Sequence, residues 1–320
     1  MIADRPLAPG LLVSQLGFGT SQIGNINNSQ CGVRFVPKVD AEAVLEHAAQ
    51  NGITLFDTAP GYGLAEDLCG TLKRHYGDGI TVATKGGADA DGRRNFSPAF
   101  LRDEIAASLA KLGRPIDLYQ INKPSLEHLA DDAILDILSE AKFSGQIRYA
   151  GIIVGDVDAG WACVERTEID CLQVMFNLIY HEPWDLMRHA ASLGKGVIVR
   201  SPLNSGLLSG SYTHETRFDP VDERSQYFVG PTYQARLHAL AQIQADLSIE
   251  NDQLLTQAIR FILSVSEVTT LIPAASSITQ LQRYITIAQG CSLMDRARLD
   301  EIIDVVSRHM GRLQLRVQNL

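Results

Sequence analysis

The sequence has 320 residues, of which 45% are apolar and 20% are charged, and its formal net charge at pH 7 is −9. A chain of this length and composition can bury a large core, as one large α/β domain or as two small ones. The acidic balance weighs against a nucleic-acid-binding protein, because nucleic acid selects a basic face. No apolar run approaches the roughly 18–20 residues that span a bilayer, so we expect no membrane partner.

The cysteines, the histidines and the first residues indicate a metal-free protein of the cytoplasm. The cysteines are odd in number and form neither a CxxC motif nor a Cys/His metal spacing, so we interpret them as buried or idle thiols in a reducing compartment. The eight histidines show no ligand spacing and no HExxH motif. The segment that begins at Met1 lacks the apolar core of a signal peptide. The cysteines are Cys31, Cys69, Cys163, Cys171 and Cys291.

Short apolar segments, predicted to be strands, alternate along the chain with segments that have helix signals. Asp40 is a candidate N-cap for a first helix, and a later helix begins at Ser97-Pro98 and is ended by Gly113. The predicted strands are Leu16–Thr20, Ile53–Asp57, Ile80–Thr84, Asp117–Ile121, Ile147–Val154, Cys171–Met175, Gly196–Arg200 and Val268–Ile272. The predicted helices are Asp40–Gln50, Ala65–His75, Pro98–Leu112, Leu126–Phe143, Ala159–Thr167, Pro183–Leu193, Tyr233–Leu247, Asn251–Ser264, one from Ile278 and a tail helix from Asp295.

About eight strand–helix units in succession predict a parallel sheet, and eight units fit a closed (β/α)₈ barrel better than an open sheet. No linker or break in composition divides the chain, so we expect a single domain over residues 1–320. The polar stretch Asn204–Thr232 predicts a long loop at the C-terminal rim of the barrel. The tail helix is expected to pack across the bottom of the barrel or against a partner, and the oligomeric state stays open.

Two common catalytic or cofactor motifs are absent. A glycine-rich segment begins at Gly17, but the third glycine of GxGxxG is replaced by Gln22, which argues against a Rossmann domain. Ser205 lies in Leu-Asn-Ser-Gly-Leu, which fails the GxSxG pattern at both ends, so we expect no nucleophile elbow.

An acid, a phenol and an amine follow two successive predicted strands: Asp57, Tyr62 and Lys85. If these strands are neighbours in a barrel, the three side chains meet at its C-terminal rim, where barrel enzymes have their active sites. A buried ammonium beside a tyrosine stabilises the phenolate and so makes the phenol a better proton donor, while a carboxylate keeps the lysine charged. The alternative is a structural Asp–Lys pair with an incidental tyrosine.

Several segments, in the same order and at matching spacing over nearly the whole chain, resemble aldo-keto reductases. The resemblance implies a (β/α)₈ barrel that binds NADPH without a Rossmann domain and reduces an aldehyde or ketone to an alcohol by hydride transfer. It implies that Tyr62 is the general acid, Lys85 its activating partner and Asp57 the anchor of the lysine. The segments are Phe-Asp57-Thr-Ala-Pro-Gly-Tyr62-Gly, Ala-Thr-Lys85-Gly-Gly, Asp117-Leu-Tyr-Gln-Ile, Arg200-Ser-Pro-Leu-Asn-Ser-Gly-Leu-Leu-Ser-Gly210 and Ile272-Pro-Ala-Ala-Ser-Ser.

The sequence departs from the family pattern at Asn122 and at the pair Ile153-Val154. Asn122 stands where the family usually has the catalytic histidine; asparagine can donate a hydrogen bond to a carbonyl oxygen but cannot carry a proton or a positive charge. Some branches, including potassium-channel β subunits, also have asparagine there, and a strand-end residue without a chemical role is the alternative. Ile153 and Val154 stand where the family commonly has the Ser-Asn pair that holds the nicotinamide carboxamide, and neither side chain can form a hydrogen bond.

The same resemblance assigns the cofactor site. Gln173 matches the remaining carboxamide contact, and Arg200, whose guanidinium plane can stack on a ring, replaces the usual aromatic residue; an ion pair at the strand end is the alternative. Ser276 and the helix amides after it suit an oxyanion. NADPH is the family default, and NADH stays open. The implied residues are Gly19, Thr20, Gln173, Arg200, Ser201, Leu203, Ser205, Gly206, Ile272, Ala274, Ser276, Gln280 and Arg283.

Three functions therefore remain. The first is an active NADPH-dependent carbonyl reductase with a small-molecule substrate; the second is a cofactor-binding regulatory or sensor protein with little turnover; the third is a non-redox acid/base enzyme on the same scaffold. The substrate cannot be read from the sequence, and a sugar, a ketone or a small aldehyde all fit. Tyr212, Tyr227, Phe228 and Tyr233 either line an apolar cleft or serve in packing.

Overall fold

Eight parallel strands form a barrel with helices around it in the computed structural model, which describes residues 2–24, 38–88, 92–113, 115–220, 222, 224–290 and 292–310. Each strand pairs with its neighbour in chain order from β3 to β10, and parallel bridges from Leu16 to Leu271 and from Gly19 to Ala274 close the ring. The (β/α)₈ prediction is therefore confirmed. The strands are β3 (Phe18–Gly19), β4 (Leu55–Asp57), β5 (Thr81–Gly86), β6 (Ile116–Asn122), β7 (Ile147–Ile153), β8 (Cys171–Met175), β9 (Gly196–Arg200) and β10 (Thr270–Leu271).

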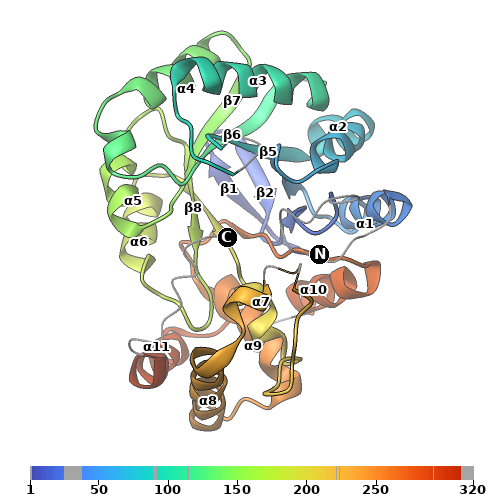
Figure 1. Cartoon of the computed structure of the whole chain (residues 1–320), viewed down its shortest axis with the longest axis vertical. Coiled ribbons are helices and arrows are strands. Elements are labelled where there is room, and N and C mark those ends of the chain that lie inside the picture. The colour runs from blue at the N-terminus through green and yellow to red at the C-terminus, as the bar shows by residue number, and fades with distance from the viewer. Residues whose placement is uncertain are drawn as a thin grey trace.

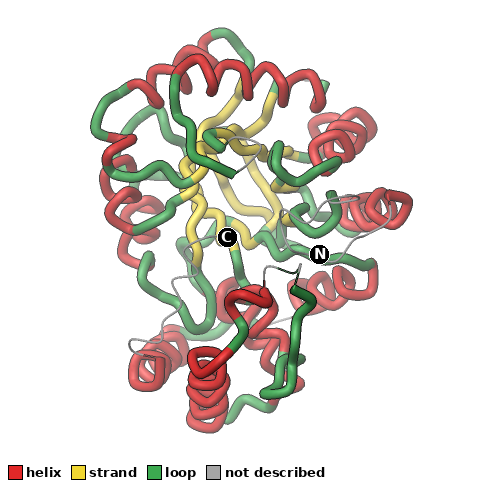
Figure 2. The backbone as a smooth tube through the Cα atoms, viewed as in Figure 1, coloured by secondary structure: helices red, strands yellow, loops and turns green. Residues whose placement is uncertain are grey.

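The helices surround the strands, which occupy the interior of the molecule (Figures 1 and 2). Two long helices, α8 and α11, contact each other, and the imidazole of His309 on α11 pairs with Asp246 on α8 at 2.8 Å. The helices are α1 (Lys38–Gln50), α2 (Ala65–Tyr76), α3 (Pro98–Leu112), α4 (Ala133–Phe143), α5 (Val157–Cys163), α6 (Trp184–Ser192), α7 (Arg224–Tyr227), α8 (Gly230–Leu247), α9 (Leu254–Ser264), α10 (Ile278–Gly290) and α11 (Arg296–Met310).

A hairpin that the sequence did not predict closes the N-terminal end of the barrel. It consists of β1 (Asp4–Ala8) and β2 (Leu11–Ser14), and its apolar side chains join those of the barrel interior in one buried cluster. A Cβ added to Gly196, at the start of β9, would lie only 2.2 Å from the carbonyl oxygen of Leu7, so the hairpin packs directly on the strand. The bottom of the barrel is thus covered by the hairpin, and the tail helix α11 packs on α8 instead.

Several predicted boundaries were wrong, and local capping explains two of them. The helix predicted over Leu126–Phe143 is interrupted: a short 3-10 turn precedes α4, and a carboxylate oxygen of Asp131 accepts from the amide of Ala133 at 3.0 Å. The Asp156 side chain accepts from the amide of Ala159 at 2.9 Å, so α5 begins earlier than predicted. Asp40, predicted as an N-cap, lies inside the first turn of α1.

Other predicted elements were right where the local signal was strong. The strands Cys171–Met175 and Gly196–Arg200 have the predicted bounds. Helix α3 begins at Pro98 and is followed by Gly113, whose φ of 69° is the left-handed conformation that glycine adopts without strain.

The three cysteines that the structure describes are buried, which predicts unreactive thiols. Burial raises the pKa of Cys69 and Cys163 to about 12 and that of Cys171 still further. Because only the thiolate is nucleophilic, we expect iodoacetamide at pH 8 to label these residues in urea but not in the folded protein. Mass spectrometry that resolves each cysteine checks this, and rapid labelling of Cys171 in the native state would contradict it. Cys31 and Cys291 lie outside the described residues.

The sequence predicts neither a metal site nor a membrane-spanning helix, and the described residues bear on both. There, no group of three or more His, Cys, Asp and Glu side chains is arranged to hold a metal ion. No helix of those residues is both long enough and apolar enough to cross a bilayer.

Candidate active site

A cavity of about 650 Å³ opens where the barrel strands end. Asp57, Asn122 and Arg200, which end β4, β6 and β9, all lie in its wall. Of the residues predicted for the site, only Thr20 and Ser276 are not in the wall. Those that line it are Asp57, Tyr62, Lys85 and Asn122, together with Gly19, Gln173, Arg200, Ser201, Leu203, Ser205, Gly206, Ile272, Ala274, Gln280 and Arg283.

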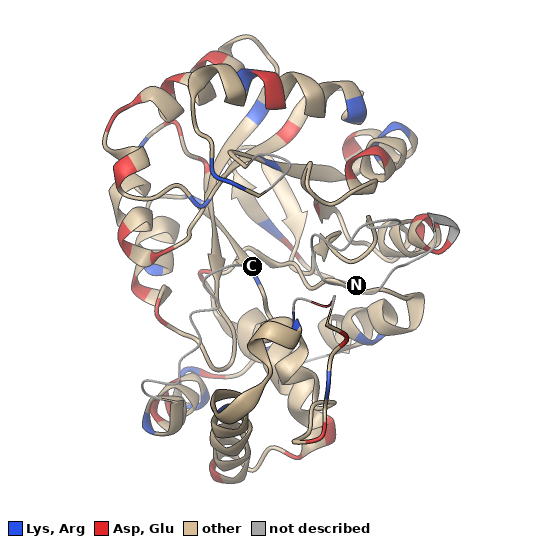
Figure 3. Cartoon of the chain, viewed as in Figure 1, with Lys and Arg blue, Asp and Glu red and all other residues tan. Residues whose placement is uncertain are grey.

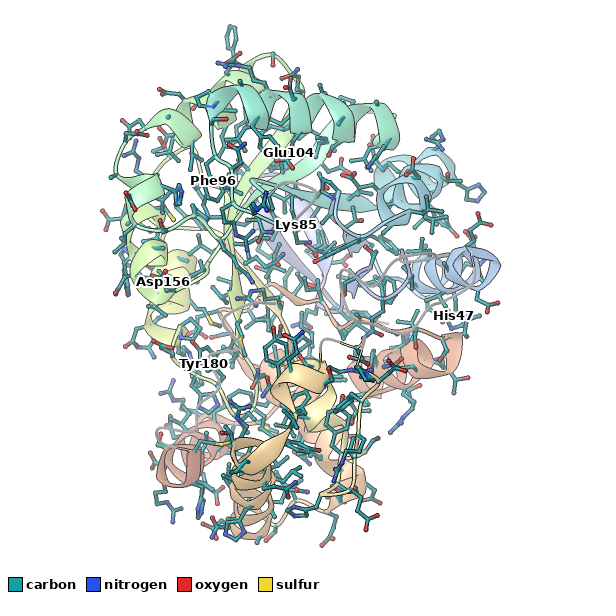
Figure 4. All side chains as sticks on the ribbon, in the orientation of Figure 1. His47, Lys85, Phe96, Glu104, Asp156 and Tyr180 are labelled. Carbon is teal, nitrogen blue, oxygen red and sulfur yellow. The ribbon has the colours of Figure 1, made fainter. Side chains whose placement is uncertain are left out.

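Lys85 and Asp57 form a buried ion pair at the base of this cavity, and Lys85 lies inside the ring of helices (Figure 4). The Lys85 ammonium also donates to the carbonyl oxygen of Thr58 at 2.8 Å and lies 4.8 Å from the centre of the Tyr62 ring. Burial acts to lower the pKa of Lys85, but the Asp57 carboxylate and the Tyr62 phenol outweigh it, so the pKa is raised. The lysine therefore stays charged at neutral pH, beside the phenol.

Two buried glutamines hold the other oxygen of the Asp57 carboxylate. The side-chain nitrogen of Gln120 donates to Oδ2 at 3.0 Å, and that of Gln173 donates to the same oxygen at 2.9 Å. The Gln173 nitrogen also donates to Oε1 of Gln120 at 2.9 Å. With both of its N–H groups engaged, Gln173 has its carbonyl oxygen left to accept from a ligand.

Sequence reasoning missed Gln120, which belongs to this hydrogen-bonded group of Asp57, Gln120 and Gln173. It pairs with Lys85 across β5 and β6 and is fully buried. A glutamine between the buried residues Tyr119 and Ile121 of β6 was the available signal, because a buried amide requires partners. Thr20 has a related supporting place: its amide and hydroxyl donate to the backbone carbonyl of Asp57 at 2.9 and 3.0 Å.

Ile153, the last residue of β7, and Val154, which follows it, line two different cavities. Ile153 is buried and lines the main cavity, whereas Val154 lines a neighbouring cavity of about 40 Å³. Arg200 borders both cavities, and one of its nitrogens donates to the carbonyl oxygen of Val154 at 3.4 Å. Burial is the main cause that lowers the pKa of Arg200 to about 10, so the guanidinium is still charged at pH 7.

The loop after β9 has an unusual backbone. Ser201, Asn204 and Ser205 have φ values of 51°, 47° and 53°, in the left-handed region, and Gly206 follows with 94°. Such a conformation costs a non-glycine residue about 1–3 kcal/mol, and it persists where the surroundings impose it, often at functional sites. Here the Tyr212 hydroxyl donates to the carbonyl oxygen of Ser205 at 2.7 Å and holds the turn.

The approach to α10 forms the adjoining wall. The hydroxyl of Ser277 caps the helix by accepting from the amide of Gln280 at 3.2 Å, and the side chain of Gln280 accepts from the amide of Ser276 at 3.0 Å. Gly19 packs against this segment so tightly that an added Cβ would lie 3.0 Å from the carbonyl oxygen of Ile272. Gly19 therefore borders the cavity with its backbone, because no side chain fits between it and Ile272.

The aromatic residues of the long loop have mixed places. Tyr212 lines the cavity, as expected from the interpretation that these aromatic residues line a cleft. Phe228 and Tyr233 are buried and pack against each other with ring centres 5.5 Å apart, so they serve in packing. The cavity wall also contains Arg94, Lys123 and Arg224, cationic residues that sequence reasoning did not select.

Comparison with known proteins identifies the family of this barrel. The model of the aldo/keto reductase family matches residues 15–304. The chain belongs to the aldo/keto reductase family. The resemblance inferred from sequence segments is therefore confirmed, and the cavity at the strand ends is a candidate active site of an aldo/keto reductase.

Curated relatives of this aldo/keto reductase are similar over about two thirds of their own length. It is 30% identical over 225 residues to aldo-keto reductase str7 of Strobilurus tenacellus, covering 67% of this chain and 65% of that protein. It is 30% identical over 230 residues to the NADH-specific methylglyoxal reductase of Escherichia coli (64% and 68%). It is 32% identical over 215 residues to L-galactose dehydrogenase of Arabidopsis thaliana (62% and 65%).

Solved structures of the family share the fold of this aldo/keto reductase. The holo form of AKR11C1 from Bacillus halodurans aligns with a TM-score of 0.78 at 23% identity, over 95% of this chain and 96% of that one. The glycerol dehydrogenase AKR11B4 of Gluconobacter oxydans aligns with a TM-score of 0.78 at 24% identity, over 96% and 95%.

Proposed function

We propose that this aldo/keto reductase is an NAD(P)H-dependent oxidoreductase that reduces an aldehyde or ketone to an alcohol. The observation that carries the proposal is the buried Lys85–Asp57 pair beside the Tyr62 ring, at the base of a cavity in the C-terminal rim. The family and the relatives, named as reductases and dehydrogenases, support the reaction class.

The residues of the cavity fit a dinucleotide. The left-handed loop around Ser205 and Gly206 presents backbone to the cavity, and such turns bind phosphate oxygens through their amides. Gly19 borders the same cavity without a side chain, because a Cβ there would lie 3.0 Å from the carbonyl oxygen of Ile272. The carbonyl oxygen of Gln173 suits the amide donor of a nicotinamide. We therefore assign the loop after β9 and the start of α10 to the nucleotide.

The choice between the two nucleotides follows from one further residue. Arg283, on α10, lines the same wall and supplies a cation for a 2′-phosphate, which favours NADPH. One relative is named as NADH-specific, so NADH belongs in every test.

Tyr62 acts as the general acid in this proposal. The loop after β9 and the start of α10 would hold NAD(P)H, which would supply the hydride to the carbonyl carbon. The Tyr62 hydroxyl gives its proton to the carbonyl oxygen, and the Lys85 ammonium stabilises the phenolate that remains. Asp57 holds the ammonium in place. Asn122, at the end of β6, donates a hydrogen bond to the same oxygen and orients the substrate, without carrying a proton.

Nucleotide titration followed by turnover tests the proposal. Protein fluorescence is titrated separately with NADPH and NADH, and oxidation of the bound nucleotide is then followed with a panel of reactive aldehydes at high enzyme concentration. We expect binding of at least one nucleotide and turnover with at least one aldehyde. Tight binding without any turnover would favour the regulatory alternative, and activity independent of added nucleotide would favour the non-redox enzyme.

A further inference from the structure

A layer of polar side chains lies inside the barrel at the base of the candidate active site. Many charged residues of the chain lie on the surrounding helices (Figure 3), but Asp57 of β4, Gln120 of β6 and Gln173 of β8 are buried in the ring of strands. These strands alternate with β5 and β7 in the sheet. Because alternate strands of such a barrel supply the side chains of one interior layer, the three residues belong to the same layer.

This polar layer lies on an apolar one. Residues two positions apart on a strand point to the same side of the sheet. Leu55, Leu118 and Cys171 each precede a member of the polar layer by two residues. They are fully buried and belong to the apolar cluster that the N-terminal hairpin joins. Amide groups placed on such neighbours are stable only where their N–H and C=O groups have partners.

Gln120 connects the other two members of the polar layer. Its Nε2 donates to Oδ2 of Asp57 at 3.0 Å, and its Oε1 accepts from Nε2 of Gln173 at 2.9 Å. Between β6 and β8 lies β7, where Gly151 is the residue opposite Gln120. An added Cβ on Gly151 would lie 3.3 Å from Cγ of Gln120. The glycine therefore gives Gln120 the space to reach across β7.

These contacts determine which way the amide of Gln173 is turned. A glutamine amide has its two donors on the nitrogen and its acceptor on the oxygen. The nitrogen of Gln173 faces two acceptors, Oδ2 of Asp57 at 2.9 Å and Oε1 of Gln120. The oxygen is consequently turned away from both, and it is the atom that the proposed function assigns to the nicotinamide amide.

Gln120 itself has no access to the reacting groups. It is fully buried and is not among the residues of the cavity wall. It can act only through its two partners: Gln173, and Asp57, whose other oxygen pairs with Lys85. One set of hydrogen bonds thus joins the place of the nicotinamide to the ion pair beside Tyr62.

We propose that Gln120 is a positioning residue of the carbonyl reduction, which turns the Gln173 amide toward the nicotinamide and holds the Asp57 carboxylate against Lys85 without touching nucleotide or substrate. The inference rests on the proposed function, because it concerns the same site. A change at Gln120 should therefore alter how the protein recognises a carboxamide that Gln120 never contacts.

Binding of a nicotinamide analogue tests the orientation of Gln173. The reduced acetylpyridine analogue of NADPH has a methyl ketone in place of the carboxamide and cannot donate to Gln173. We expect the wild-type protein to bind it about three- to tenfold more weakly than NADPH, the effect of one hydrogen bond. In Gln120→Met, which keeps the side-chain length but lacks the amide, this ratio should fall toward one. Fluorescence titration measures the dissociation constants, and NADH with its own analogue replaces NADPH if it binds more tightly.

The variant Gln120→Glu tests the contact to Asp57 through pH. A protonated carboxyl can replace the amide, because its O–H donates to Asp57 and its carbonyl accepts from Gln173. An ionised carboxyl lacks the donor and repels Asp57, and this like charge raises the pKa of the introduced group. Relative to wild type, kcat of the variant should therefore increase about tenfold or more from pH 8 to pH 6. The comparison cancels the titration of Asp57, Lys85 and Tyr62, which both proteins share.

Gln244→Met is the matched control. Gln244 lies on α8, outside the cavity wall, and its Nε2 donates to the carbonyl oxygen of Ile249 at 3.4 Å. The same substitution there should leave kcat and the ratio of dissociation constants unchanged. Circular dichroism and thermal unfolding verify that the variants fold. If Gln120→Met does not fold, Gln120→Glu at pH 8 takes its place in the binding test.

The outcomes separate this inference from the proposed function. A wild-type ratio of dissociation constants in Gln120→Met, or a wild-type pH profile in Gln120→Glu, overturns the inference and leaves the carbonyl reductase intact. The inference also fails if the wild-type protein does not distinguish NADPH from its analogue. If nucleotide binds but no carbonyl compound is turned over, the proposed function fails, and the ratio of dissociation constants alone decides the role of Gln120. If no nucleotide binds, both are wrong.

Discussion

Tyr62→Phe is expected to lower kcat/KM for carbonyl reduction by a factor of about 10²–10⁴, the usual contribution of a general acid. The change removes the hydroxyl that donates the proton but keeps the ring that lies 4.8 Å from the Lys85 ammonium. Nucleotide affinity should therefore be unchanged. Steady-state kinetics and a fluorescence titration with NADPH, on the same preparation, measure both quantities.

Tyr76→Phe provides the matched control. Tyr76 ends α2, and its hydroxyl donates to the carboxylate of Glu46 at 2.6 Å, outside the cavity wall. Its replacement should leave kcat/KM and nucleotide affinity as they are. If Tyr62→Phe kept nearly full turnover, another group would have to supply the proton, and the role given to Tyr62 would be wrong.

Asp57→Asn is expected to lower the free energy of unfolding by about 3–5 kcal/mol as well as to impair turnover, because it leaves the Lys85 ammonium buried without a counter-charge. Both side chains of the pair are almost fully buried, with 3% and 5% of each residue exposed. Gln120 and Gln173 both donate to the Asp57 carboxylate. If the asparagine NH₂ took the place of that oxygen, two hydrogen-bond donors would face each other. Urea denaturation, compared with kinetics, separates the two effects.

The double variant Asp57→Asn/Lys85→Met distinguishes ion-pair energetics from loss of packing. Removing the ammonium together with the carboxylate should recover much of the stability but none of the turnover. Glu140→Gln serves as a control on an exposed pair, since Arg102 and Glu140 meet at 2.7 Å on the surface and little change in stability is expected. A double variant as unstable as Asp57→Asn would mean that the buried charge is not the cause.

The local sequence determined the fold class and the central cluster. Strand and helix signals are local, so the alternation of the two predicted a parallel barrel, and Pro98 and Gly113 bounded a helix correctly. Parallel strands end at one rim, and the structure accordingly brings Asp57, Tyr62 and Lys85 together. Their catalytic roles, and the single domain over residues 1–320, stay predictions.

The tertiary structure decided what depends on residues far apart in the chain. Gln120 on β6 donates to Asp57 on β4, which lies 63 positions earlier in the sequence. The two residues meet because β4, β5 and β6 are successive strands of the sheet. The hairpin at the bottom of the barrel is stabilised by packing against strands from the whole chain. The cavity wall is the clearest example: Asn122, Gln173 and Arg200 lie on separate strands, and only closure of the barrel brings their side chains to one space.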